Sequence, residues 1–97
     1  MTIDQDTIYQ YIDGKELLHS TLSERERLLQ ELEQLAKTHQ KASRPGKVVA
    51  FPLVHAQTLL FELSVIGEYI NVLIVEVNSY AERCGKPRIE FVETLLQ

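Results

Sequence analysis

Several residue types are rare or absent in this sequence, and each shortage excludes a class of protein. Among 97 residues there are one cysteine, no tryptophan, three prolines and four glycines. The lone Cys84 cannot form a disulfide within the chain, so a disulfide scaffold is excluded. With 44% hydrophobic and 25% charged residues, the composition also excludes a disordered tail and a collagen-like repeat. We therefore expect one packed domain spanning residues 1–97.

The chain also lacks a basic and then apolar leader at its start, which favours a cytoplasmic location. Its most apolar stretch, residues 53–81, is long enough to suggest a membrane span. This stretch nevertheless contains Glu62, Glu68 and Glu76, and three carboxylates in one span argue against lipid contact. We expect no membrane partner.

The first forty residues carry two helical patterns. In residues 3–20, apolar side chains recur near helical spacing, at Ile8, Tyr11, Ile12 and Leu18. The segments Thr21-Leu-Ser-Glu24 and Ser23-Glu-Arg-Glu26 then match the capping box that opens many helices. We expect a first helix over residues 3–20 and a second one starting near Ser23.

The second helical pattern has one apolar stripe on an otherwise charged segment. The stripe consists of Leu28, Leu29, Leu32, Leu35 and Ala36. The helix should end near Ala42, because Ser43-Arg-Pro-Gly46 combines a turn proline with a glycine. Residues 43–47 therefore form a Pro/Gly hinge, and residues 48–51 are open between a short strand and a loop.

A long central helix is predicted from about residue 52 to residue 84. Pro52 suits a first helical position, Gly85 suits a left-handed cap, and Pro87 stops the helix. The β-branched run at 70–77 would also fit a buried strand. Helical spacing decides against a strand, since apolar or small residues recur at steps of four and three over about four heptads: Ala56, Leu60, Leu63, Gly67, Ile70, Ile74, Val77, Ala81 and Cys84.

This helix has more apolar surface than one neighbour covers. One face is assigned to the core, yet large apolar side chains also lie on the opposite face, at Phe61, Val65, Tyr69, Val72 and Val75. About 32 helical residues span ~48 Å, whereas a compact chain of this length has a diameter of ~32 Å. We predict an all-α bundle, with two short N-terminal helices, the long helix and a short C-terminal helix over 88–97. The apolar residues Phe61, Val65, Tyr69, Val72 and Val75 are the expected dimer interface of this bundle.

Residue patterns for catalysis, metals and cofactors are scarce. His19, His39 and His55 are too widely spaced for a common zinc motif, and no phosphate-binding glycine loop occurs. A metal-dependent all-α nucleotide hydrolase would need adjacent helical carboxylate pairs, for which this chain offers only Glu62, Glu68 and Glu76 in scattered positions. We expect no catalytic, metal or cofactor site.

Charge is the most polarised feature of the chain. No acidic residue occurs between Glu33 and Glu62, and this interval carries a formal charge of +4, from Lys37, Lys41, Arg44 and Lys47. The preceding residues hold eight acidic and three basic side chains, and the following ones hold six and three, so the flanks carry −5 and −3. This basic segment is a candidate contact for an anion or an acidic partner.

The function predicted from these features is binding without catalysis. We expect a cytoplasmic adaptor or regulator that acts through protein–protein contacts as a helical homodimer. A nucleic-acid-associated regulator using residues 37–47 is the alternative, disfavoured by the acidic net charge of −4 and by the absence of interleaved aromatic residues. The hydrolase is the weakest hypothesis, and the sequence decides neither the protein partner nor the orientation of the dimer.

Overall fold

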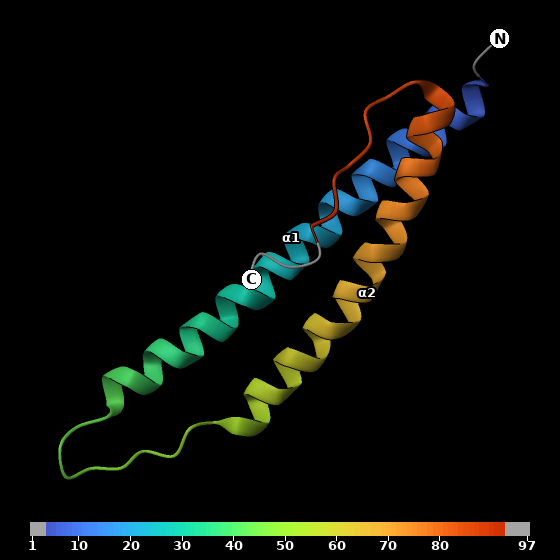
Figure 1. Ribbon diagram of the computed structural model, residues 1–97. Helices are drawn as coiled ribbons and strands as arrows, with labels where there is room; N and C mark the ends of the chain where they lie inside the picture. Colours follow the sequence, from blue (N-terminus) through green and yellow to red (C-terminus); the bar gives the residue numbers. More distant parts are fainter. Residues whose placement is uncertain (1–3, 93–97) are drawn as a thin grey trace.

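A computed structural model describes residues 4–92, and within them the chain forms two long helices. Helices α1 (Gln5–Ala42) and α2 (Leu53–Cys84) lie antiparallel and are joined by a loop at residues 43–52 (Figure 1). The all-α class is confirmed. The compact four-helix bundle is wrong: the radius of gyration is 19.4 Å and the extents are 73 × 28 × 17 Å, whereas a compact chain of this length has ~12.5 Å.

The two predicted N-terminal helices are a single helix, so the prediction of a break near residue 21 is wrong. The hydroxyl of Thr21 donates to the carbonyl of Leu17 at 2.7 Å, and that of Ser23 donates to His19 at 3.1 Å. Both hydroxyls therefore bond to backbone carbonyls of the preceding turn inside one continuous helix, and neither caps a new helix. The cap lies at Asp4, whose carboxylate accepts the amide of Asp6 at 3.1 Å.

Helix α2 begins and ends where its sequence signals predict. It starts directly after Pro52, and Gly85 adopts the left-handed conformation with φ 66°. The amide of Lys86 donates to the carbonyl of Ala81 at 2.9 Å, which closes the last turn. The strand alternative for residues 70–77 is thereby eliminated.

The connection between the helices is a loop without a strand. Ser43 is extended, Gly46 has φ 80°, and the amide of Lys47 donates to the carbonyl of Arg44 at 3.0 Å. Residues 48–51 join no sheet in the part of the chain described. They are held against α1, because His39 bonds the carbonyl of Val49 at 2.9 Å and meets the ring of Phe51 edge-on.

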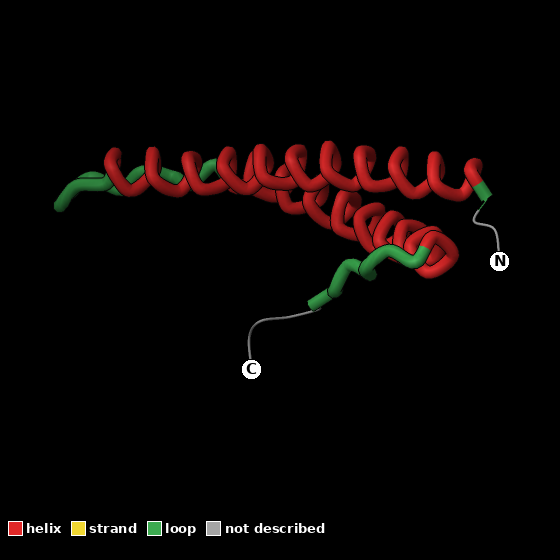
Figure 2. The backbone as a smooth tube through the Cα atoms, turned by 90° about the horizontal axis from the view of Figure 1, so that it is seen from above, coloured by secondary structure: helices red, strands yellow, loops and turns green. Residues whose placement is uncertain are grey.

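The predicted C-terminal helix over 88–97 is also wrong for its described part. After Pro87 the chain runs in extended form back along the helix pair (Figures 1 and 2). Residues 93–97 lie outside the described residues. Residues 86–92 are called the tail below.

The core is a narrow seam between the two helices. Tyr11, Val77, Ala81 and Cys84 form one cluster near the end of α2, and Leu18, Ile70 and Leu73 form a second one beside it. Ile89 of the tail packs against both clusters. The helices pack closely at Gly14, where an added Cβ would lie 3.0 Å from a methyl carbon of Val77.

Two glycine substitutions should therefore have opposite effects. Gly14→Val inserts atoms into a filled contact and should lower the free energy of unfolding by about 1–3 kcal/mol. In Gly67→Ala the added Cβ meets nothing within 4 Å. The gain in helix propensity should therefore raise the free energy of unfolding by up to about 1 kcal/mol. Urea unfolding at one fixed protein concentration measures both. A Gly14→Val variant as stable as the parent chain would contradict the close crossing.

Candidate functional site

The candidate site is the side of α2 that faces away from α1. Helical spacing places the core residues Leu59, Ile70 and Leu73 on one side of α2 and leaves five large apolar residues on the other. Their exposed fractions are 71% for Phe61, 53% for Val65, 45% for Tyr69, 52% for Val72 and 70% for Val75. We call these five residues the outer face.

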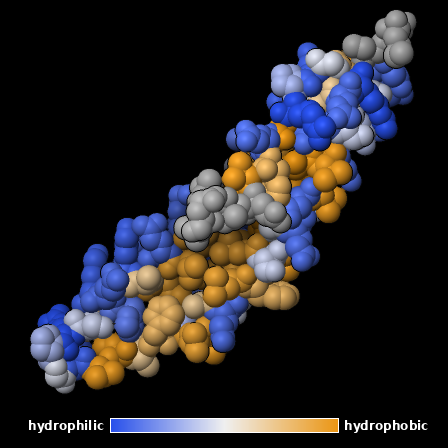
Figure 3. Space-filling view, in the orientation of Figure 1, coloured by the Kyte–Doolittle hydropathy of each residue, from blue (hydrophilic) through white to orange (hydrophobic). Residues whose placement is uncertain are grey.

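The outer face belongs to a larger apolar surface. Figure 3 shows a band of hydrophobic side chains along α2, whereas hydrophilic side chains cover the neighbouring length of α1. Other exposed apolar residues of α2 continue the surface toward the loop, namely Leu53, Val54 and Leu60. Residues 4–92 thus leave eight large apolar side chains of α2 exposed.

A charged rim borders the outer face on the side of α1. A groove of about 480 Å³ separates Phe61 and Val65 from the α1 residues Glu24 and Arg27. The guanidinium of Arg27 lies 2.6 Å from Glu24 and 3.2 Å from Glu31. Its hydrogen bond with Glu24 lowers the pKa of that carboxyl and raises the pKa of Arg27. Both groups are therefore charged at neutral pH, which makes the rim polar.

The four cations of the basic segment all lie toward the loop end of the hairpin and are exposed. Lys37 is paired within α1, 2.8 Å from Glu33, and its hydrogen bond lowers the pKa of that carboxyl. Lys41 is in the last turn of α1, while Arg44 and Lys47 flank the turn. The structure therefore gathers Lys41, Arg44 and Lys47 at one tip, with Lys37 partly neutralised.

The carboxylates of α2 do not form a metal site. Glu62, Glu68 and Glu76 are exposed, and residues 4–92 contain no group of three histidine, cysteine or acidic side chains close enough to hold a metal ion. The hydrolase hypothesis therefore has no assembled carboxylate cluster in the part of the chain described.

One buried polar residue was missed by sequence reasoning. Asn78 is 7% exposed and binds the tail twice: its amide donates to the carbonyl of Ile89 at 3.0 Å, and the Ile89 amide donates back at 2.7 Å. A single side chain thus pairs with the backbone as a neighbouring strand would. Its sequence signal is an asparagine beside Val77 on the buried side of an apolar helix.

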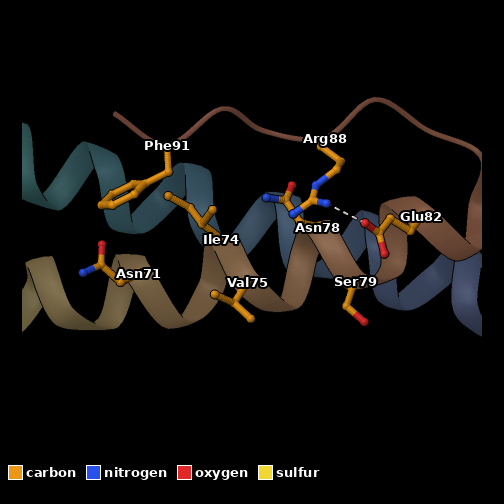
Figure 4. A pocket seen from close by; sticks show the side chains of 8 residues that line it. All are labelled: Asn71, Ile74, Val75, Asn78, Ser79, Glu82, Arg88 and Phe91. Atoms are coloured by element: carbon orange, nitrogen blue, oxygen red, sulfur yellow. Dashed lines mark hydrogen bonds and ion pairs between the residues drawn. The ribbon is translucent and has the colours of Figure 1, made fainter. Parts of the chain in front are cut away.

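The tail forms a shallow pocket with α2. The pocket has a volume of about 440 Å³, and Phe91 covers it from the tail side while Asn71 and Val75 line it from the helix (Figure 4). Arg88 closes one end through an ion pair with Glu82 at 2.6 Å. These groups hold the tail in place, and the apolar residues around them extend the surface of α2.

Length and composition alone would also allow α2 to cross a membrane. Its most apolar 18-residue window has a mean hydropathy of 1.7, and 17% of that window is buried. The mostly buried core helix of a soluble protein passes the same test, so one such helix is weak evidence for a membrane span. The absence of a membrane partner therefore stays a prediction, as does the cytoplasmic location.

Comparison with known protein families, with curated proteins and with solved structures found no match for this chain.

The tail anchor can be tested by hydrogen exchange. Asn78→Ala removes both bonds to Ile89 and leaves its backbone groups unpaired, which costs about 1–3 kcal/mol. We expect exchange of the Ile89 amide to accelerate at least tenfold, measured by mass spectrometry or NMR. Ser64→Ala, at an exposed polar residue of α2 that does not line the tail pocket, is the control. Unchanged protection of Ile89 in Asn78→Ala would contradict the anchoring role.

Proposed function

We propose that this protein is a non-catalytic interaction protein, an adaptor or regulator of the cytoplasm, that works as a homodimer joined through the outer face of α2. The observation that carries the proposal is the exposure of the five outer-face residues on one helix side. Contiguous apolar surface of this kind marks interaction sites in soluble proteins. A second copy offers a surface of the same chemistry and length.

The rest of the molecule supports this assignment. The flank of α1 beside α2 carries the charged network of Arg27 with Glu24 and Glu31, so α1 already has a polar side suited to water. The apolar surplus is confined mainly to α2. A dimer through α2 covers this surplus and leaves both α1 helices exposed for other macromolecules.

The second candidate function is association with nucleic acid through the loop tip. Lys41, Arg44 and Lys47 are exposed there, and no acidic residue lies between Glu33 and Glu62. Contacts with phosphates would give binding that weakens steeply with salt. Oligonucleotide binding lost in the triple variant Lys41→Gln, Arg44→Gln and Lys47→Gln would favour this function. The acidic net charge of −4 disfavours it.

The dimer is tested by single charge insertions. Val65→Glu and Val72→Glu each place a carboxylate in the apolar contact of both copies, and desolvation of each charge costs several kcal/mol. Because both positions are about half exposed in the single chain, we expect folded monomers with native helicity. The dimer dissociation constant should rise at least about 100-fold, measured by sedimentation equilibrium.

The matched control is Leu29→Glu, an apolar-to-charged change at a 43% exposed position of α1, outside the outer face. It should leave the dimer unchanged. A parent chain that is monomeric at micromolar concentration, or Val72→Glu variants that remain dimeric, would overturn the proposal. Flotation of the parent chain with lipid vesicles, abolished by Val72→Glu, would instead identify a membrane surface as the occupant.

A further inference from the structure

We infer that the two copies pair antiparallel, so that the loop end of each lies beside the terminal end of the other. This inference rests on the proposed homodimer and specifies its partner surface. The loop end comprises residues 34–61, and the terminal end comprises residues 4–16 and 76–92, which the hairpin brings together (Figure 1).

The two ends carry opposite charge. The loop end has four cations and no acidic residue, so its formal charge is +4, although Lys37 is paired with Glu33 just outside it. The terminal end has seven acidic and four basic residues, giving −3; residues 76–92 are neutral, with three residues of each sign, and the excess comes from the start of α1, at Asp4, Asp6, Asp13 and Glu16. The middle of the hairpin, residues 17–33 and 62–75, has six acidic and two basic residues, so the positive charge is concentrated at the loop end and the rest of the hairpin is acidic.

The separation of the ends makes this charge pattern decisive for orientation. The molecule is 73 Å long, whereas electrostatic interactions are screened over ~8 Å at physiological salt. Each end therefore responds to what lies beside it. Parallel copies would place +4 beside +4 and −3 beside −3, whereas antiparallel copies place each end beside its opposite.

The outer face has the symmetry that an antiparallel pair needs. Phe61 and Val75 are its limits, and their midpoint, residue 68, lies half a residue from the middle of α2 (Leu53–Cys84). A two-fold axis between residues 68 and 69 overlays the full length of both helices. It sets Val65 against the partner subunit's Val72, and it sets Phe61 beside the partner subunit's Val75, one residue out of register.

Side-chain size and charge along the face agree with this register. A parallel pair would set Phe61 against its own copy at one end and Val75 against its own copy at the other, which gives a contact of uneven thickness. It would also bring Glu76, which follows Val72 by one turn, beside its own copy. The antiparallel pair moves Glu76 to the neighbourhood of Phe61, whereas Glu68 lies near the axis in both arrangements.

Spin-label distances test the orientation directly. In a Cys84→Ala background, a label at the exposed Gln57 lies 11.5 residues from the axis, so antiparallel copies separate the two labels by about 35 Å along the helices. Parallel copies would leave them about 10–20 Å apart. A label at Ser64 is the control, because both arrangements keep its separation short, near 15–20 Å.

The expected result is a long distance at Gln57 with a short one at Ser64, in a protein of dimeric mass. Short distances at both positions in a dimer would overturn the antiparallel inference alone. Monomeric mass without dipolar coupling at Ser64 would overturn the homodimer itself.

A charge reversal gives an independent readout. The triple variant Lys41→Glu, Arg44→Glu and Lys47→Glu makes both ends of the hairpin acidic. In the antiparallel dimer it should raise the dissociation constant about tenfold at low salt, with the effect fading at high salt. A dissociation constant unchanged at low salt would contradict the juxtaposition of loop and terminal ends.

Discussion

The structure depends on one imbalance: α2 is apolar around most of its circumference, and a single neighbouring helix covers one side of it. The seam with α1 buries Leu59, Ile70, Leu73 and Val77, while Phe61 and Val75 remain about 70% exposed. Residues 4–92 contain no third helix to place on the open side. Uncovered apolar surface is unfavourable in water, and the dimer that we propose rests on this cost.

The tail shows how the chain covers what it can. Ile89 closes both core clusters from one position, and the paired bonds from Asn78 hold it there. An asparagine inside an apolar helix would be costly without these partners. The tail lies along the groove between the helices, so the opposite side of α2 stays open. Its position therefore leaves the outer face uncovered in the part of the chain that the structure describes.

Charge and shape have separate roles in the assembly that we propose. The apolar outer face supplies the contact area but, near its centre, distinguishes poorly between the two directions of a partner helix. The opposite charges of the loop and terminal ends lie far from this centre and distinguish the directions well. Electrostatic complementarity of this kind contributes to specificity more than to affinity.

Local sequence alone determined those structural elements whose residue patterns can be explained in only one physical way. The span of α2, the Gly85 cap and the Pro-Gly turn after Ala42 all follow from residues within a few positions of one another. Helical periodicity also places Phe61, Val65 and Val72 on one side. The break near residue 21 was wrongly predicted because serine and threonine hydroxyls serve equally well as caps and as partners of carbonyls four residues earlier.

Only the tertiary structure decided that residues 86–92 are extended, since their partner is Asn78, 11 residues from Ile89. It also decided the open, elongated shape, because the side of α2 that α1 covers depends on how two distant segments pack.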